Sequence, residues 1–429
     1  MTNLWSENHP AKFWMTDDRF SREDWDEAVQ RALPILDLSH PPGSTDAMLE
    51  SVLGEGQFGS GRWKLRDTYS LYYHLKPLIP RWVITTLRQT VRRSQRITYP
   101  LMFPIEDRYV RFLQEVLRLV MEKHGLYEVR CRAFWPHKKR FGFVLRHDIE
   151  KNAGQQFVRK VADLEESYGF RSVFNFVAER YPLDYQLIGE LKERGFEIGI
   201  HGLHHDGKDF ASEEEFMRRS VKVNQYLRQL DSVTYCAPLT HRNGDWLQHL
   251  DIEYDQSFFD TDPYEPMSGG TMSIFPFIMG KVVEMPYTLL QDFSLYRVLN
   301  HRTPQMWLDK LAFIRENHGM ALLNTHPDYL LDDGLMSCYD EFLSAVSAMD
   351  DHWHALPRDA ARWWRRRHAQ SFSSADGNDL FMVIRRTEDG IVWRDVSTIE
   401  DTSPAGVEAA PGAQPVQQAN GIAASHGSD

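Results

Sequence analysis

Two histidines spaced four residues apart follow a short apolar run near the middle of the chain. His201 comes directly after the segment FEIGI, and His205 lies four positions later. A polar imidazole has no packing reason to end an apolar strand, and Gly202 lets the chain turn so that His205 faces back. Asp148 ends another such run, FGFVLRHD. Because two neutral imidazoles and a carboxylate form the open ligand set of a catalytic divalent metal, these residues are candidate ligands.

Further polar residues lie at the ends of other apolar runs. Glu150 follows Asp148 by two positions, so the two lie on the same side of an extended chain. Cys236-Ala237-Pro238 ends one later run, and Asn324-Thr325-His326 ends another. In parallel α/β folds the carboxyl ends of the strands converge on one face, where sites are built. We therefore expect these residues to gather at one rim of a sheet.

The elements that must position these residues alternate between strand and helix from residue 141 onward. Runs of β-branched and aromatic residues are typical of strands, and they occur in FGFVLRHD, RSVFNFVAE, FEIGIH, SVTYCAP, YDQSFF, VVEMPYTLL and MALLNTHP. Segments of helical periodicity separate several of them, and Gly169 and Gly195 stand where helices should end. This alternation predicts a parallel sheet, either open and doubly wound or closed as a barrel. About seven parallel strands in so short a segment favour the barrel.

The first 140 residues are expected to form a mainly helical accessory region. Ser21 and Asp24 fit a capping box at the start of a periodic helix. Residues 105–124 have apolar positions at three- and four-residue steps and predict a second amphipathic helix. Residues 81–96 contain five arginines. A helix there would present its basic face either to solvent or to anionic lipid headgroups at a membrane surface.

The C-terminal part of the chain changes character twice. Residues 380–396 read as a β-hairpin that turns at Asp389-Gly390. Beyond residue 400 the chain lacks aromatic and large aliphatic clusters, which predicts a disordered tail. The expected organisation is an accessory region at 1–140, an α/β domain at 141–370, a hairpin at 371–399 and a tail at 400–429.

Charge and composition argue against several classes of protein. The net charge is −12, from 49 basic and 61 acidic residues, whereas a general nucleic-acid binder is usually basic. The three cysteines are widely spaced and predict neither a disulfide framework nor a CxxC metal site, so we expect inert thiols. No basic segment followed by an apolar run opens the sequence, and no apolar stretch reaches about 18 residues. A cytoplasmic location is therefore the expectation.

Four short motifs resemble those of the polysaccharide deacetylase family, which is NodB-like and known as carbohydrate esterase family four. The family's first motif ends a strand with two adjacent aspartates, and Leu145-Arg146-His147-Asp148 stands there in this chain. Its His-(Ser/Thr)-x-x-His motif corresponds to residues 201–205, and its Arg-x-Pro-(Tyr/Phe) motif to 236–239. Its late Leu-x-x-His motif corresponds to 323–326. The resemblance implies a distorted (β/α) barrel of the deacetylase type and a metal-dependent hydrolase.

The resemblance also implies a role for each matching residue. Asp148, His201 and His205 correspond to the metal ligands of the family. His326 corresponds to the general acid that protonates the leaving amine. The backbone amide of Leu239 corresponds to a donor of the oxyanion hole. The implied cofactor is one divalent metal ion, with zinc the first candidate for a His-His-Asp site.

Three positions depart from the family pattern, as in a divergent branch with Arg-His-Asp at the first motif. His147 replaces the aspartate base, Cys236 replaces the arginine that orients that base, and Gly202 replaces the serine or threonine. A neutral imidazole at 147 would need no arginine partner, so the first two changes fit together. The base remains open between His147 and Glu150, and Glu150 is alternatively an additional metal ligand.

The expected reaction is hydrolysis of an N-acetyl amide on a sugar or glycan intermediate of cell-surface polysaccharide metabolism. A metal would polarise the carbonyl and activate water, and backbone N–H groups would stabilise the oxyanion. Asp260 and Asp262 follow the strand YDQSFF, and they either line the substrate cleft or are loop carboxylates. A sugar on a lipid or nucleotide carrier suits a cytoplasmic enzyme. The alternatives are a glycan-binding or assembly protein that has lost its base, and a hydrolase of another small-molecule amide or ester.

Overall fold

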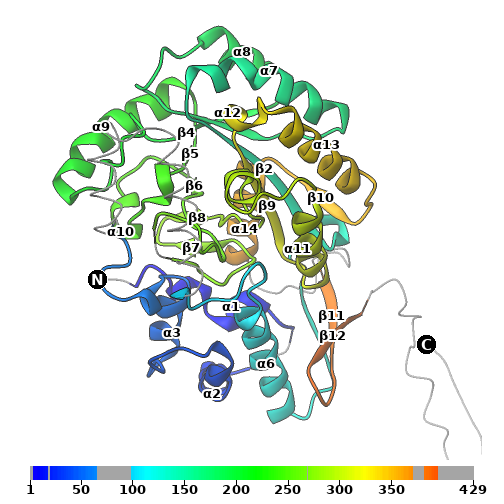
Figure 1. The fold of residues 1–429 in the computed structure, drawn as a ribbon. Helices are drawn as coiled ribbons and strands as arrows, with labels where there is room; N and C mark the ends of the chain where they lie inside the picture. The colour runs from blue at the N-terminus through cyan, green and yellow to red at the C-terminus, as the bar shows by residue number, and fades with distance from the viewer. Residues whose placement is uncertain (1–2, 18–19, 65–97, 268, 371–380, 395–429) are drawn as a thin grey trace, which may run out of the picture.

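The molecule is built around one curled β-sheet with helices on its outer side (Figure 1). The structure is a computed structural model that describes residues 3–17, 20–64, 98–267, 269–370 and 381–394. Helices from the first 140 residues lie together beneath the sheet, next to the C-terminal hairpin. The predicted basic helix at 81–96 and the predicted tail at 400–429 lie outside the described residues.

The main sheet has nine strands in the order β10-β2-β3-β4-β5-β6-β8-β7, with β9 paired to the other edge of β2. The strands are β2 (Phe141–Ile149), β3 (Val173–Phe176), β4 (Glu197–Ile200), β5 (Thr234–Tyr235), β6 (Tyr254–Asp255), β7 (Phe277–Met279), β8 (Val282–Glu284), β9 (Met320–Thr325) and β10 (His352–His354). Every pair is parallel except β7 with β8. All seven strands predicted from the sequence are present, and β2 is buried along its whole length, as a central parallel strand must be.

Regular pairing stops between β8 and β9, and a bridge from Leu289 to Leu323 spans this gap. A second bridge, from Tyr287 to Phe259, extends the pairing of β8 with β6. The amide of Leu289 also donates to the carbonyl of Leu322 at 3.1 Å. The sheet therefore curls into a half-barrel that these few bonds complete, which confirms the distorted barrel predicted from the sequence.

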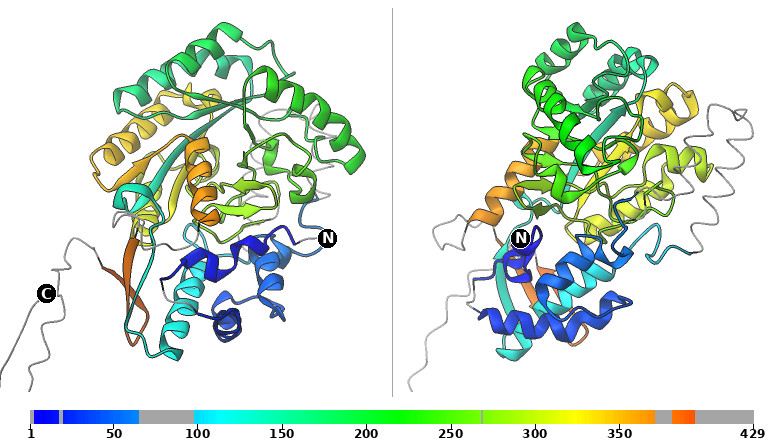
Figure 2. Two further views of the ribbon diagram at one scale, coloured as in Figure 1. Left: turned by 180° about the vertical axis from the view of Figure 1, so that it is seen from behind. Right: turned by 90° about the vertical axis from the view of Figure 1, so that its left-hand side faces the viewer.

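Amphipathic helices cover the outer face of the curled sheet (Figure 2). They are α7 (Asn152–Ser167), α8 (Tyr185–Glu193), α9 (Glu213–Gln229), α10 (Gly244–Leu247), α11 (Gln305–Glu316), α12 (Pro327–Leu330), α13 (Asp333–Ser347) and α14 (Pro357–Ala369). Gly169 and Gly195 have φ values of 77° and 86° just after α7 and α8, so both end helices as predicted. Short helical turns complete the connections, at η5 (Pro136–Lys138), η6 (Pro238–Thr240) and the π-helix η7 (Phe293–Val298).

The N-terminal region is mainly helical, as expected. It contains η1 (Ser6–Asn8), α1 (Pro10–Trp14), α2 (Arg22–Ala32), η2 (Leu33–Leu36), α3 (Thr45–Val52), η3 (Gly56–Phe58) and α6 (Arg108–Lys123). The capping box before α2 is present in both directions. Ser21 Oγ accepts from the amide of Asp24 at 3.1 Å, and Asp24 Oδ2 accepts from the amide of Ser21 at 3.0 Å. The amphipathic helix predicted at 105–124 is α6.

The C-terminal hairpin pairs with a strand from the N-terminal region. It consists of β11 (Phe381–Arg386) and β12 (Ile391–Arg394), and β11 is antiparallel to β1 (Glu128–Arg132). The amide of Thr387 donates to the carbonyl of Gly390 at 2.9 Å, which closes the predicted turn. Sequence patterns did not predict β1, because a five-residue strand with only two apolar residues carries little periodic signal. The hairpin and the N-terminal region therefore share one three-stranded sheet.

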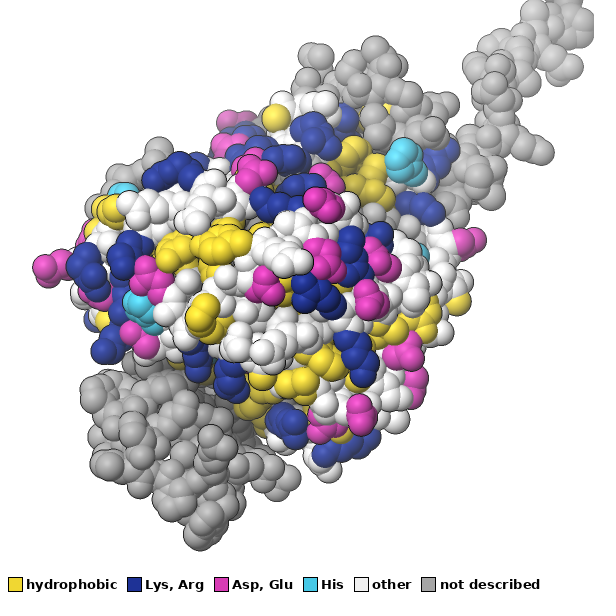
Figure 3. All heavy atoms as spheres, turned by 90° about the horizontal axis from the view of Figure 1, so that it is seen from above, with side chains coloured by type: hydrophobic (Ala, Val, Ile, Leu, Met, Phe, Trp, Pro, Cys, Tyr) yellow, Lys and Arg dark blue, Asp and Glu magenta, His cyan; other side chains and the backbone are white. Residues whose placement is uncertain are grey.

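Charges of both signs are interspersed over the surface seen from above (Figure 3). Arg194 is an example, since it contacts Asp163 at 2.6 Å and Glu166 at 2.8 Å. Within the described ranges, every helix is too short or too polar to span a lipid bilayer.

A buried ion pair joins the N-terminal region to the half-barrel. Arg242 and Glu55 both have fully buried side chains, and Arg242 Nε donates to Glu55 Oε2 at 3.1 Å. Glu55 also accepts from the amide of Gly270 at 2.7 Å and from the indole of Trp63 at 3.2 Å. Arg242 donates in turn to the carbonyl of Thr240 at 2.7 Å. The N-terminal region thus reaches the loop that carries the third motif.

Arg242→Met is expected to destabilise the protein by about 3–5 kcal/mol, because it leaves Glu55 as an unpaired buried charge. Arg362→Met is the matched control, since it breaks a half-exposed ion pair with Glu253 and should cost about 1 kcal/mol or less. Thermal unfolding of both variants beside the parent measures the difference. Equal, small losses in the two variants would contradict a docking role for the buried pair.

Candidate metal and catalytic site

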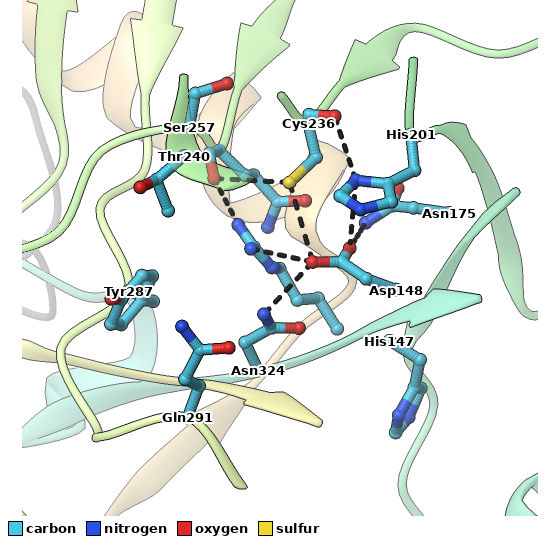
Figure 4. A network of polar contacts seen from close by, with 12 residues as sticks. His147, Asp148, Asn175, His201, Cys236, Thr240, Ser257, Tyr287, Gln291 and Asn324 are labelled. Carbon is cyan, nitrogen blue, oxygen red and sulfur yellow. Dashed lines mark hydrogen bonds and ion pairs between the residues drawn. The ribbon is translucent and has the colours of Figure 1, made fainter. Parts of the chain in front are cut away.

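Side-chain alternation along β2 divides the first motif between the two faces of the sheet. Arg146 pairs in register with Asn324 on β9, and Asp148 pairs with Asn175 on β3. These four side chains meet inside the half-barrel, whereas His147 points away from them (Figure 4). Successive residues of a strand face opposite sides, so Arg146 and Asp148 share one face and His147 must take the other.

Asp148 is a buried carboxylate held by donors from four strands or strand ends. Asn175 Nδ2 donates to its Oδ1 at 2.9 Å. Its Oδ2 accepts from Arg146 Nη2 and from Asn324 Nδ2, each at 3.0 Å, and Cys236 Sγ lies 3.7 Å away. Burial alone would raise the pKa of Asp148, but the charge of Arg146 and the neighbouring donors hold the pKa well below its ordinary value. Asp148 is therefore ionised at neutral pH.

His201 presents one ring nitrogen to the protein and leaves the other for a ligand. Its side chain is buried, and its Nδ1 lies 3.0 Å from the carbonyl oxygen of Cys236. A carbonyl only accepts, so Nδ1 carries the proton and Nε2 is left with a lone pair. Burial lowers the pKa of His201 to about 4, so the ring is neutral at pH 7. A neutral imidazole fixed through Nδ1–H by a backbone carbonyl is the usual form of a metal-binding histidine.

The loop after β4 brings His205 back beside His201, as the sequence predicted. Gly202 and His205 both have positive φ, at 68° and 52°, and the two imidazole rings lie 5.1 Å apart. His205 Nε2 lies 3.3 Å from Glu150 Oε1. Asp328 fixes the backbone of Glu150 by accepting from its amide at 2.7 Å. His201, His205 and Glu150 therefore form one group.

Two glycines leave the space that this arrangement needs. A Cβ at position 199 would lie 1.8 Å from Asn175 Oδ1, so Gly199 makes room for the side chain that holds Asp148. A Cβ at position 202 would lie 2.4 Å from Asp209 Oδ2 in a backbone with positive φ. The departure of Gly202 from the family's serine or threonine therefore has a steric reason in this chain.

His326 lies at the end of β9 and is paired with Asp292. Asp292 caps η7 and accepts from both the backbone amide and Nδ1 of His326, each at 2.7 Å. Burial opposes a charge on His326, but Asp292, Glu150 and Asp148 together raise the pKa of His326 to about 9. In the metal-free protein His326 is thus protonated at neutral pH, which is the state that a general acid needs.

Comparison with solved structures found proteins that are similar to somewhat more than half of this chain. The chain resembles polysaccharide deacetylases of known structure. One, assigned as a polysaccharide deacetylase of Mycobacterium smegmatis, is 19% identical with a TM-score of 0.47 and covers 58% of this chain and 98% of its own. Another so assigned, from Pseudomonas aeruginosa, is 16% identical with a TM-score of 0.45 and covers 56% and 96%. A PuuE allantoinase is 13% identical with a TM-score of 0.44 and covers 56% and 95%. No protein-family model and no curated protein sequence matched the chain.

The structure does not bring His147, one of the two bases considered from the sequence, to the group formed by the other polar residues. Its Nε2 lies 2.5 Å from Glu165 on α7, and its Nδ1 lies 2.7 Å from Thr325 Oγ1. The ring is fully buried and stacks on Phe174. Glu165 also accepts from Tyr339 Oη at 2.6 Å. His147 is therefore part of the packing between the sheet and its outer helices, and its geometry does not support the base role.

The three residues considered for substrate contact have different surroundings. Leu239 is half-buried in η6 with a φ of 62°. Asp260 forms a buried ion pair with Lys310, whose Nζ lies 2.6 Å from Oδ2. Asp262 is also buried, and it accepts from Tyr287 Oη at 3.2 Å. The structure thus gives Asp260 a structural partner and does not bring it to the histidines.

A second set of potential ligand atoms belongs to Asp148, His201 and Cys236, all within 4.8 Å of one another. The nitrogen of His201 nearest to Asp148 is Nδ1, at 3.9 Å, and this atom already donates to a carbonyl. Burial raises the pKa of the Cys236 thiol, and the guanidinium of Arg146 adjoins Asp148. A cation would therefore be poorly held by these three groups.

The sequence patterns missed some residues of the site and gave others no role. Asn175 was not predicted, although a polar residue in an otherwise apolar strand is a signal for it, and Asn324 was expected at the rim without a partner. Arg146 was quoted only as part of a motif, although its position two residues before Asp148 predicts a shared face. Asp292 lies in a loop 34 residues before His326, and no local pattern indicates their pairing.

The raised pKa of His326 predicts a distinct pH dependence of the metal-free protein. Its protonated form stabilises the fold fully below about pH 6.5, and this contribution is lost as the pH rises through about 9. The stability advantage of the parent over His326→Gln should therefore shrink across that window. Nuclear magnetic resonance titration of the histidine rings measures the pKa directly. Asp292→Asn should lower the pKa of His326, because it removes the largest of the charges that raise it, and an unchanged value would refute the pairing.

Proposed function

We propose that the chain is a metal-dependent hydrolase that removes an N-acetyl group from a sugar or glycan intermediate. One observation supports this most strongly. His201 and His205 converge with the carboxylate of Glu150, and the protonated His326 lies close enough for Glu150 to raise its pKa. A cation site and a proton donor thus adjoin at the carboxyl ends of the strands, where α/β enzymes carry their sites.

One pair of donor atoms beside the proposed site has the spacing that a divalent cation requires. Zinc binds imidazole nitrogen and carboxylate oxygen at about 2.0–2.2 Å, so two tetrahedral ligand atoms lie about 3.3–3.6 Å apart. The 3.3 Å between His205 Nε2 and Glu150 Oε1 fits this spacing. His201 supplies a second imidazole. Its Nε2 is available to a metal because its Nδ1 is bonded to the carbonyl oxygen of Cys236. We therefore propose that Glu150, His201 and His205 hold the metal, with zinc the first candidate.

A metal bound there would polarise the scissile carbonyl and lower the pKa of water. The remaining roles belong to the chain. His326, kept protonated by Asp292, delivers a proton to the leaving nitrogen from Nε2, because Nδ1 is bound to Asp292. The backbone amide of Leu239, in a turn with positive φ, is the proposed donor to the oxyanion. Asp262, joined to Tyr287, is the proposed contact to substrate hydroxyls.

The substrate proposal rests on the four family motifs in order. An N-acetylated sugar on a lipid or nucleotide carrier remains our first candidate, with a cytoplasmic location. Contact of residues 81–96 with a membrane surface stays a prediction. A hydrolase of another small-molecule amide has the same donor set and is the second candidate. Turnover of N-acetylglucosamine oligomers, nucleotide-linked N-acetyl sugars and small amides by zinc-loaded protein distinguishes them.

Metal analysis tests the ligand set. The parent protein should carry about one divalent ion per chain, and Glu150→Gln, His201→Ala and His205→Ala should each weaken zinc binding by more than about 100-fold. Loss of a residue that merely supports a ligand costs only about 10–100-fold. Elemental analysis and zinc titration provide the measurement.

His147→Gln is the matched control for metal analysis, because His147 is equally buried but faces α7. It should keep its zinc. Retention of zinc by all three ligand variants would end the assignment, and loss of zinc by His147→Gln alone would place the ligand on the other face of β2.

His326→Ala is expected to keep the metal and to lose turnover by about 10²–10⁴-fold, the usual contribution of a general acid. Single-turnover kinetics with an N-acetyl sugar that the parent hydrolyses measures the loss. The loss of turnover should be smallest with substrates whose leaving amine is a weaker base, because such an amine needs less protonation to leave. If His326→Ala instead released the zinc, His326 would be a ligand.

A further inference from the structure

Arg146 is a buried cation whose partners lie on the inner face of the half-barrel. Its side chain is only 2% exposed, and its Nη2 donates to Asp148 Oδ2 at 3.0 Å. Its Nη1 donates to the carbonyl oxygen of Gln256, and its guanidinium lies 5.8 Å from the ring centre of Tyr287. A buried guanidinium is costly unless its hydrogen bonds are made, so the partners of Arg146 hold its side chain in this place.

Cys236 contacts the same two acceptors from the end of β5. Its Sγ lies 3.7 Å from Asp148 Oδ2 and 3.6 Å from the carbonyl oxygen of Gln256 (Figure 4). Arg146 and the side chain at position 236 therefore share one space beside Asp148. The small thiol leaves room for the guanidinium that arrives from β2.

The two oxygens of Asp148 are not equivalent. Oδ2 accepts from Arg146 and Asn324 and is contacted by Cys236, so its lone pairs are in use. Oδ1 accepts one bond, from Asn175, and faces His201 at 3.9 Å. A carboxylate with one oxygen held by several donors and the other beside His201, a proposed metal ligand, is placed to accept a proton from the attacking water.

We infer that Asp148 is the general base of the proposed hydrolase and that Arg146 is its positioning residue, supplied from the same strand in the space left by Cys236. This inference rests on the proposed function. It assigns the base to neither His147, which faces α7, nor Glu150, which belongs to the ligand group. In the step, Asp148 Oδ1 takes one proton from water while the oxygen of that water bonds to the amide carbon. The leaving nitrogen receives a proton from His326.

The test moves the arginine from position 146 on β2 to position 236 at the end of β5. Arg146→Met should lower the turnover of an N-acetylglucosamine oligomer by at least about 100-fold, mainly in kcat, with zinc content unchanged. Arg146→Met combined with Cys236→Arg should regain at least about tenfold of this loss, because the new guanidinium reaches the same two acceptors. Cys236→Arg alone crowds two guanidinium groups and should be worse than the double variant. No recovery in a double variant whose thermal unfolding matches that of Arg146→Met would overturn the positioning role.

Asp148→Asn separates this inference from the proposed function, because its readout includes zinc binding. As the base, Asp148 can be neutralised with zinc retained and turnover lost by about 10²–10⁴-fold. Loss of zinc from Asp148→Asn would make Asp148 a ligand and overturn the inference, with the metal site intact. Absence of turnover in the zinc-loaded parent, on sugars and amides alike, would end the proposed function and the base role with it. Absence of zinc in the parent would end the metal site itself.

Discussion

The buried charge of Asp148 is the constraint on which the arrangement of the inner face depends. Moving a carboxylate out of water costs several kcal/mol unless donors replace the lost hydration. Here the donors are Arg146 on β2 itself, Asn175 on β3 and Asn324 on β9. Asn175 sits opposite Asp148, and Asn324 sits opposite Arg146, two residues earlier on β2. A shift of one residue in the register of either neighbouring strand would move its asparagine to the other face of the sheet and remove the bond to Asp148. The charge therefore fixes the register of three adjacent strands while it serves the site.

On the outer face of the same strand, buried polar groups are also paired with one another. His147 and Glu165 compensate each other there, and Thr325 and Tyr339 complete the bonds. Both faces of β2 thus carry polar groups in the middle of an apolar core, and Arg146, His147 and Asp148 each have at least one partner on another element. The two faces are connected through Thr325, which directly precedes His326. The contact of His147 with Thr325 therefore joins β2 to the strand end that carries the proposed acid.

Local sequence patterns predicted the strands, the order of the motifs and the turn at Gly202, because each depends on a short run of residues. The base could not be found in this way. The resemblance to the family places His147 at the position of the aspartate base. Alternation along a strand instead puts Arg146, Asp148 and Glu150 on one side and His147 on the other. Pairings over long separations were also out of reach. Asp292 with His326, Glu55 with Arg242 and β1 with β11 depend on tertiary contacts that no single segment encodes.

Two buried histidines of this site are driven to opposite charge states by their partners. Burial disfavours the cation on both rings, and it wins at His201, whose pKa falls to about 4 although Asp148 Oδ1 lies 3.9 Å from its Nδ1. At His326 the same burial is overcome by the carboxylate of Asp292 at 2.7 Å, and the pKa rises to about 9. A neutral imidazole suits a metal, and an imidazolium suits proton delivery. Asp292, which caps η7, is therefore the residue that turns His326 into an acid, while His201 on the 201–205 loop stays neutral.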